Sequence, residues 1–225
     1  VIRRLTEIND KEVNIYCAKA LSNLVANPKM RNKVVQAGVF EEWMELIDGG
    51  DTECCKVCGN ALMHMTASAM YQTTTITYMI DNNILERVHK MIEMKDKYIY
   101  FYCATILCNL VVDESNHDRL IKNGILDSID KLTLKSVEAE TKIRCGAALE
   151  RLSSSLSTEH AERVVKSLSL LLNNTSDASV THYISVAFFS LSSRPDCQPL
   201  LARNEEIHKL LISMMRGAPG ETQIH

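Results

Sequence analysis

Glycine, proline and aromatic residues are scarce in this sequence, which argues against an all-β fold. The 225 residues include 8 Gly, 4 Pro and 5% aromatic residues, whereas 46% are hydrophobic. A β-sandwich or β-barrel needs many tight turns, and those turns draw heavily on glycine and proline. Because the apolar fraction is ample for a buried core, the composition favours a helical protein.

The sequence also lacks a strong charge of one sign and any long apolar run. Its net charge is -3, so no global positive field attracts nucleic acid or acidic lipid. No run approaches the roughly 18 apolar residues that a membrane-spanning helix needs, and residues 1–4 (VIRR) do not begin a signal peptide. Neither nucleic-acid binding nor direct membrane contact is therefore expected. Since the first residue is not Met, we expect the chain to be a piece of a longer protein.

An internal repeat is the strongest pattern in the sequence. Five segments align: CAKALSNL (17–24), CGNALMHM (58–65), CATILCNL (103–110), CGAALERL (145–152) and ISVAFFSL (184–191). Their last residues are 41, 45, 42 and 39 positions apart. A period of about 40–47 residues is typical of helical solenoids of the armadillo and HEAT types.

A second column of residues recurs in step with the first. Ala37-Gly38-Val39, Asn82-Asn83-Ile84 and Asn123-Gly124-Ile125 each follow a polar helix and precede an amphipathic one. Glycine or asparagine at such a joint indicates a left-handed residue that ends one helix and turns the chain into the next. The segment 160–172 (HAERVVKSLSLLL) carries no glycine, so the fourth repeat is expected to be degenerate there.

Each repeat is thus predicted to contain a short first helix, a second helix and a longer third helix, with apolar residues at three- and four-residue spacing. The expected first helices include 29–37 and 114–123, and the expected second helices are 39–48, 84–94 and 125–134. The expected third helices are 11–26, 51–68, 96–111, 136–155 and 178–193.

The sequence resembles armadillo repeats, whose third helix ends in Ala-Leu-Ser-Asn-Leu, as residues 20–24 do here. The resemblance implies an all-α, right-handed superhelical solenoid of three-helix repeats. We expect a single armadillo-repeat domain over 1–216 and a tail over 217–225. The expected repeats are 1–27 (partial), 28–69, 70–112, 113–156, 157–194 and 195–216 (partial).

The third helices define a common register, numbered here from position 0 at the family's Asn column: Asn23, His64, Asn109, Arg151 and Ser190. Position −6 is Cys17, Cys58, Cys103, Cys145 and Ile184, and position −5 is Ala18, Gly59, Ala104, Gly146 and Ser185. Two adjacent small residues let a helix approach its neighbours closely. Four cysteines are thereby explained as small core residues.

A polar face of the third helices is the predicted binding groove. At 100° per residue, positions 0, −4, −7 and −11 share one face, while −2, −3 and −6 turn inward. In a solenoid, such positions align from repeat to repeat. The residues expected to bind a partner are Tyr16, Lys19, Asn23, Asn60, His64, Tyr102, Thr105, Asn109, Arg151 and Tyr183.

The armadillo resemblance implies that the Asn at position 0 hydrogen-bonds the backbone of an extended peptide. Asn23 and Asn109 match that residue, whereas His64, Arg151 and Ser190 do not. Family members that import basic signals add a Trp at position −4, but the only Trp, Trp43, lies on a second helix. Reading of basic localisation signals is therefore not expected.

We interpret the chain as a non-enzymatic protein-interaction scaffold or adaptor that binds an extended or helical segment in this groove. The alternative is a structural or self-assembling solenoid segment that acts through its exposed ends. Leu210, Leu211, Met214 and Met215 form the candidate self-association end, through which a homo-oligomer could form. Eight cysteines, half of them in a core column, suggest a reducing compartment, the cytoplasm or the nucleus.

Catalytic and metal chemistry have little support. The cluster Cys54, Cys55 and Cys58 lies near His64, but zinc sites need two ligand pairs separated by a turn, and these thiols share one helix. The sequence contains no phosphate loop, zinc-protease or nucleophile-elbow motif. We therefore expect no catalytic residues, metal or cofactor. His89, His117, His160 and His208 are expected as solvated residues on helix surfaces or near helix ends.

Overall fold

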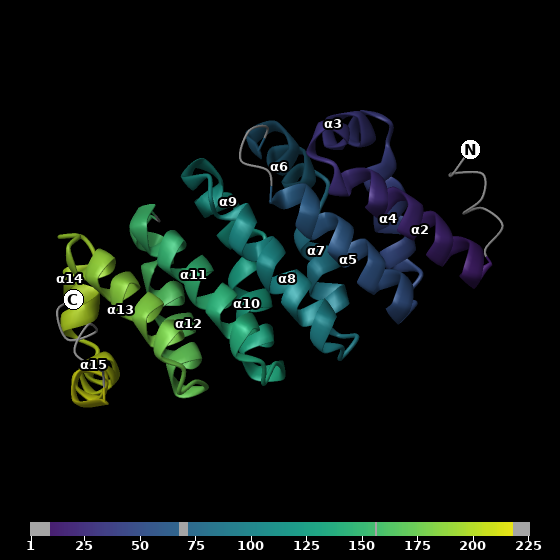
Figure 1. Ribbon diagram of the computed structural model, residues 1–225. Helices are drawn as coiled ribbons and strands as arrows, with labels where there is room; N and C mark the ends of the chain where they lie inside the picture. Colours follow the sequence, from purple (N-terminus) through teal and green to yellow (C-terminus); the bar gives the residue numbers. More distant parts are fainter. Residues whose placement is uncertain (1–9, 68–71, 156, 218–225) are drawn as a thin grey trace. The chain divides into compact units, whose positions relative to one another are not determined.

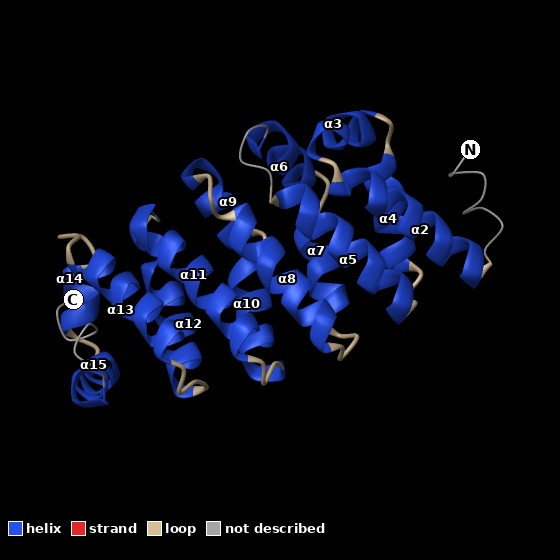
Figure 2. Ribbon diagram, viewed as in Figure 1, coloured by secondary structure: helices blue, strands red, loops and turns tan. Residues whose placement is uncertain are grey.

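The computed structural model describes residues 10–67, 72–155 and 157–217, and across these ranges it contains helices joined by loops, with no strand (Figure 2). The chain divides into two compact units, Val1–Leu110 and Val111–His225. We call them the N-terminal half and the C-terminal half. The all-α prediction is confirmed, while a single domain over 1–216 stays a prediction.

The N-terminal half contains two complete three-helix repeats after a leading third helix. Its helices are α2 (Lys11–Ala26), α3 (Pro28–Gln36), α4 (Val39–Asp48), α5 (Thr52–Thr66), α6 (Gln72–Asp81), α7 (Ile84–Ile92) and α8 (Lys97–Leu110). The third helices α2, α5 and α8 lie side by side, with α5 in contact with both neighbours (Figure 1). The second helices α4 and α7 contact each other and the third helices α5 and α8 that follow them.

The C-terminal half departs from the three-helix pattern in its middle. Its elements are η1 (Glu114–Asn116), α9 (His117–Lys122), α10 (Ile125–Lys135), α11 (Ala139–Ser155), α12 (Thr158–Asn173), α13 (Ala178–Ser192), α14 (Gln198–Ala202) and α15 (Glu205–Gly217). The third helices α11 and α13 pack together. One continuous helix, α12, replaces the first and second helices of its repeat, because no residue in it favours the left-handed conformation that a joint requires. The predicted degeneracy of this repeat is confirmed.

The three predicted joints have the expected backbone conformation. Gly38, Asn83 and Gly124 adopt φ of 74°, 59° and 89°. Each of them ends one helix and directly precedes the next, α4, α7 or α10. A left-handed residue is costly for most side chains and tolerable for Gly and Asn, so the joints explain why the sequence repeats these residues.

Aspartates set the starts of several third helices. The carboxylate of Asp51 accepts a hydrogen bond from the backbone N–H of Cys54 at 2.9 Å, and that of Asp177 accepts one from Val180 at 3.2 Å. Such N-cap residues satisfy amides that have no partner within the helix. Asp51 therefore lies just outside α5, although the sequence pattern placed it as the first helical residue.

The small residues of the third helices form the predicted core. All five residues at position −6 are buried. A Cβ added at Gly59 would lie 3.4 Å from Cβ of Tyr102 on α8, and one added at Gly146 would lie 3.3 Å from Cβ of Tyr183 on α13. Each glycine therefore lets the next third helix approach through its position −7.

Two histidines that we expected to be solvated are buried instead. The ring of His117 lies between the carbonyl oxygen of Val111 and the hydroxyl of Ser155, each 2.8 Å from a ring nitrogen. His160 is also buried, with its Nε2 3.8 Å from Asp118. Their prediction as surface residues was wrong, because residues distant in the sequence cover the helix ends that carry them. His208 is exposed and His89 half-buried.

Candidate binding groove

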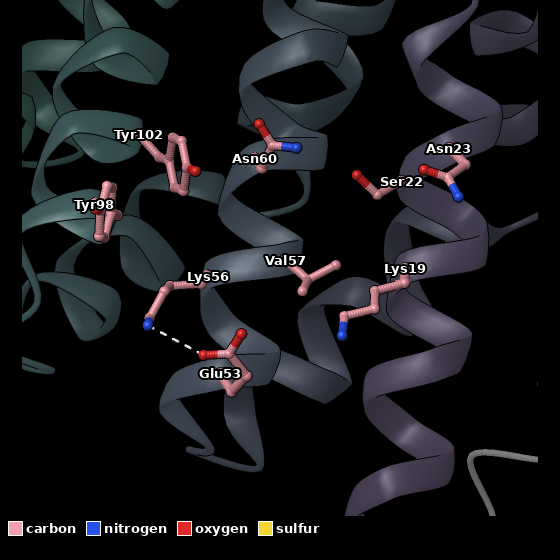
Figure 3. Close-up of a pocket in the computed structure, with 9 residues that line it drawn as sticks. All are labelled: Lys19, Ser22, Asn23, Glu53, Lys56, Val57, Asn60, Tyr98 and Tyr102. Carbon is pink, nitrogen blue, oxygen red and sulfur yellow. Dashed lines mark ion pairs between the residues drawn. The ribbon is translucent and has the colours of Figure 1, made fainter.

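The third helices of the N-terminal half line an open cavity of about 390 Å³ on their shared polar face (Figure 3). Nine residues line it: Lys19, Ser22 and Asn23 from α2, Glu53, Lys56, Val57 and Asn60 from α5, and Tyr98 and Tyr102 from α8. Three neighbouring helices therefore contribute side chains to one site.

The repeat register explains why these residues converge. Asn23 is at position 0, Lys19 and Asn60 are at −4, and Val57 and Tyr102 are at −7. These positions lie on one face of an α-helix. The stacking of α2, α5 and α8 then places equivalent faces next to one another.

Tyr102 is held close to the backbone of α5. A Cβ added at Gly59 would lie 3.3 Å from its ring atom Cδ2, so the missing side chain provides the space that the ring fills. Burial, together with the negative charge of Asp96, raises the pKa of Tyr102. Its hydroxyl therefore stays protonated at neutral pH and can donate a hydrogen bond.

The two lysines of the cavity differ in their surroundings. The ammonium of Lys56 lies 3.1 Å from Glu53 and 3.3 Å from Asp96, which ties α5 to the start of α8 (Figure 3 draws the Glu53 pair). Burial raises the pKa of Asp96, but hydrogen bonds from two backbone amides and from Lys56 outweigh it and lower that pKa overall. The ammonium of Lys19 lies 5.5 Å from the ring centroid of Tyr16. Lys56 is thus ion-paired with two carboxylates.

The structure brings together four of the predicted groove residues, Lys19, Asn23, Asn60 and Tyr102, in this cavity. Tyr16 adjoins it through Lys19. His64, Thr105 and Asn109 do not line the cavity. The hydroxyl of Thr105 donates to the carbonyl of Phe101 at 2.9 Å, and Nδ2 of Asn109 donates to the hydroxyl of Thr66 at 3.1 Å.

Arg151 and Tyr183, also predicted for the groove, belong to α11 and α13 of the C-terminal half, and both are half-buried. Tyr183 packs against Gly146 as Tyr102 packs against Gly59. The cavity itself is built by residues of the N-terminal half alone.

Five lining residues were missed as candidates: Ser22, Glu53, Lys56, Val57 and Tyr98. Glu53 and Tyr98 are at position −11, which belongs to the same helix face, and Val57 is at −7, so the register could have found them. Ser22 and Lys56 are at −1 and −8, at the edges of that face. Only the approach of neighbouring helices brings them to the cavity.

The cysteine cluster lies in the core. All eight cysteines are buried free thiols. The hydrogen bond between Cys58 and Cys54 raises the pKa of Cys58, helped by burial, and lowers that of Cys54, while burial raises the pKa of Cys55 to about 12. Within the described ranges, no three His, Cys, Asp or Glu side chains are grouped to hold a metal ion. No helix in those ranges is both long and apolar enough to span a membrane.

A second, mainly apolar cavity of about 360 Å³ lies in the C-terminal half, lined by α13, α14 and α15. Three residues of the predicted self-association end, Leu211, Met214 and Met215, line it. The side chain of the fourth, Leu210, lies outside what the structure describes.

Solved structures of armadillo repeat proteins share this fold. A designed armadillo repeat protein in complex with a (KR)4 peptide has a TM-score of 0.79 at 17% identity, over 99% of this chain and 93% of that one. Another designed armadillo repeat protein has a TM-score of 0.71 at 16% identity, over 97% and 99% of the two chains. No family model and no curated protein matches the sequence. The fold is therefore an armadillo-type α-solenoid.

Proposed function

We propose that this protein is a non-enzymatic interaction scaffold whose N-terminal half binds an extended segment of a partner protein in the cavity between α2, α5 and α8. The observation that carries the proposal is the convergence of amide, lysine and tyrosine side chains from three stacked helices on one cavity. The peptide complex of the designed armadillo repeat protein supports it, because the two chains share a fold.

The lining side chains suit a peptide main chain. Asn23 and Asn60 each offer a donor and an acceptor, which an extended backbone can satisfy because its own amides and carbonyls are free. Tyr98 and Tyr102 provide amphipathic area of the kind that dominates interface energetics. The amides would bind the backbone of the segment, and the tyrosines would pack against its side chains.

The charges of the cavity argue against a strongly basic ligand. Of the two lysines in its lining, Lys56 is paired with Glu53 and Asp96, whereas the ammonium of Lys19 lies 5.5 Å from the ring centroid of Tyr16. A segment rich in Lys or Arg would place like charges together, which is unfavourable. We therefore infer that the segment is neutral or mildly acidic, with an acidic side chain near Lys19.

A peptide-display selection against the chain tests this proposal. Selected peptides are measured by fluorescence anisotropy against the native chain and against Asn23→Ala/Asn60→Ala. Loss of two backbone hydrogen-bonding side chains should weaken binding by about 1–3 kcal/mol in total, a factor of about 5 to 150.

A matched control removes two exposed amides from other surfaces, Gln36→Ala and Asn173→Ala. The control should bind like the native chain. If the cavity variant bound the selected peptides with native affinity while its circular dichroism was unchanged, the groove would not be the binding site.

The cellular compartment belongs to the proposal as well. Eight buried free thiols suit a reducing compartment, so we propose the cytoplasm or the nucleus.

A further inference from the structure

The cavity of the N-terminal half has two ends of different chemical character. Lys19, Ser22 and Asn23 of α2 line one end, and Tyr98 and Tyr102 of α8 line the other (Figure 3). Helix α5 lies between them and contacts both helices. We call these the α2 end and the α8 end. Each end can therefore bind a different side chain of one segment that crosses the cavity.

The α2 end carries an unbalanced positive charge. Lys19 is exposed and makes no ion pair within the described ranges, and its side chain extends from α2 toward α5 in Figure 3. Ser22, one helical turn later, is only 7% exposed but lines the cavity, and its hydroxyl makes no hydrogen bond within the same ranges. An ammonium beside a free hydroxyl donor suits a carboxylate, because an ionised carboxylate only accepts hydrogen bonds.

The α8 end is balanced in charge. Lys56 pairs with Glu53 at 3.1 Å and with Asp96 at 3.3 Å. The ammonium of Lys97 lies 5.3 Å from the ring centroid of Tyr98. Two lysines and two carboxylates thus lie around this end, and their charges cancel. A charged side chain of a ligand therefore gains little there.

The surface that the α8 end offers is mainly apolar. Tyr98 is 54% exposed, and Tyr102 and Val57 are half-buried. Tyr102 cannot move toward α5, because its ring already fills the space over Gly59. A pre-positioned surface of two rings and a valine favours burial of an aliphatic or aromatic side chain.

The distance between the two ends sets the spacing of the side chains that they bind. Packed helices lie about 8–10 Å apart, so the axes of α2 and α8 are separated by about 16–20 Å. Lys19 and Tyr102 both extend toward α5 in Figure 3, which brings the two contacts closer together. An extended segment covers about 3.3 Å per residue, and the two contacts are therefore about four to six residues apart.

We propose that the partner segment is extended and carries one acidic side chain for the α2 end and one apolar side chain for the α8 end, about four or six residues apart. The separation is even because successive side chains of an extended chain point to opposite sides. Asn60, on α5 between the two ends, then hydrogen-bonds the backbone between the two side chains. This inference rests on the proposed function, since it needs a segment bound in this cavity.

A helical segment would show a different spacing. An α-helix rises 1.5 Å per residue, so a helix that spans the same two contacts would separate them by about nine to thirteen residues. The spacing of the acidic and apolar residues therefore distinguishes an extended partner from a helical one.

The peptides selected by display against the native chain test the spacing. Those that lose affinity for Asn23→Ala/Asn60→Ala should be enriched in an acidic and an apolar residue at a separation of four or six, in either chain direction. Moving the acidic residue by one position should weaken binding as much as removing it, because its side chain then points away from the cavity.

A double-mutant cycle tests the contact at the α2 end. Replacing the acidic residue of a selected peptide by its amide should weaken binding to the native chain by about three- to tenfold, and should have no effect on binding to Lys19→Met. Lys33→Met is the matched control, because Lys33 is an exposed lysine on α3 outside the cavity. This variant loses the same charge but should keep the full effect of the acidic residue.

A second cycle tests the contact at the α8 end. Replacing the apolar residue of the peptide by serine should weaken binding to the native chain by about tenfold. The same replacement should have a smaller effect on Tyr98→Ala. Circular dichroism checks that each variant folds, and Lys19→Gln replaces Lys19→Met should the latter lose helicity.

Three results would overturn this inference and leave the proposed function standing. The first is a set of cavity-dependent peptides without an acidic and an apolar residue at even spacing. The second is a separation of about nine to thirteen residues, which would show a helical partner. The third is an equal effect of the acidic residue on Lys19→Met and on the native chain. If no selected peptide depended on Asn23 and Asn60, the proposed function itself would fail, and this inference with it.

Discussion

The cavities of the two halves differ in chemistry and in the helices that build them, because three third helices line the first, whereas α13, α14 and α15 line the second. Amides, lysines and tyrosines line the cavity of the N-terminal half, whereas phenylalanine, leucine and methionine dominate that of the C-terminal half. In the first, the packing faces of α2 and α5 are covered by the next third helix, and the polar face remains. In the second, Phe189 on α13 and Met215 on α15 are exposed at the apolar cavity. The polar cavity is thus built by packed third helices, and the apolar one by three helices of different kinds.

The halves also differ in how their first and second helices are made. In the N-terminal half, Gly38 and Asn83 turn the chain between a short helix and a second helix. In the C-terminal half, Gly124 does so once, but α12 runs without a break. A helix can therefore pack against the next third helix in the place of a second helix whether or not a left-handed joint precedes it.

Removing the indole of Trp43 should have the largest effect on stability. Trp43 is fully buried in α4, and Trp43→Ala should lower the free energy of unfolding by about 3–5 kcal/mol. In hydrogen exchange, residues 10–67 and 72–110 should lose more protection than 111–155 and 157–217, because stability in a repeat protein is largely local.

Trp43→Phe is the matched control. The indole N–H has no hydrogen-bond partner among the described residues, so replacing it with another ring loses no hydrogen bond and should cost clearly less. Equal losses of stability for the two variants would contradict this explanation.

Thermal unfolding of the native chain tests the predicted single domain. One unfolding transition would support it, and two transitions would show that the two halves unfold as separate domains.

Valine at the two close-approach glycines should separate stability from binding. Gly59→Val and Gly146→Val should each cost about 1–3 kcal/mol, because both overpack a helix contact. Only Gly59→Val should also weaken binding of selected peptides, since it displaces Tyr102 in the groove. Urea unfolding and peptide titration measure the two effects, and equal loss of binding in both variants would argue against the groove.

Changing the joint residue should cost less. Gly124 has φ of 89°, and Gly124→Ala should destabilise the protein by about 1–2 kcal/mol because of the left-handed conformation. Gly124→Asn should cost less, as Asn83 adopts a similar conformation. In α12, which has no joint, Lys166→Gly should lower the free energy of unfolding by about 0.5–1 kcal/mol relative to Lys166→Ala. Urea unfolding measures all four variants, and a stabilising Lys166→Gly would show that α12 is strained by its missing joint.

The smallest effect should be a pH dependence in the C-terminal half. Hydrogen bonds from Arg194 and Thr158 lower the pKa of Asp196 to about 2. Because the folded pKa is below the unfolded value of about 3.9, this stabilisation is complete above that value and is lost as the pH falls toward 2.

Asp196→Asn should therefore flatten the decrease in unfolding free energy between about pH 4 and pH 2. Thr158→Val, which removes the hydroxyl donor but keeps the Arg194 guanidinium, should reduce the decrease partly. Urea titrations at several pH values measure this slope. If Asp196→Asn left the slope of unfolding free energy against pH unchanged, Asp196 would not contribute to the pH dependence of stability.

Much of the fold could be predicted because its signals are local. The α2 and α4 bounds match the expected ranges, and the expected bounds of the other predicted helices differ by at most a few residues, for example where the N-cap Asp51 sets the start of α5 one residue later. The groove was predicted only in part. Helix periodicity identifies a face of each helix, but not which turns of neighbouring helices lie at the same level, so Tyr98 and Glu53 were missed as lining residues; a role of Asn109 in binding stays a prediction.

The sequence by itself determined the repeat, the left-handed joints and the small-residue core column of the third helices, because each depends on backbone conformation or side-chain size within one or two helices. Only the tertiary structure decided the burial of His117 and His160, the meeting of Lys19, Asn60 and Tyr102 in one cavity, and the apolar cavity lined by α13, α14 and α15. Each of these depends on which distant segment covers a given surface, and no local preference of the chain specifies that.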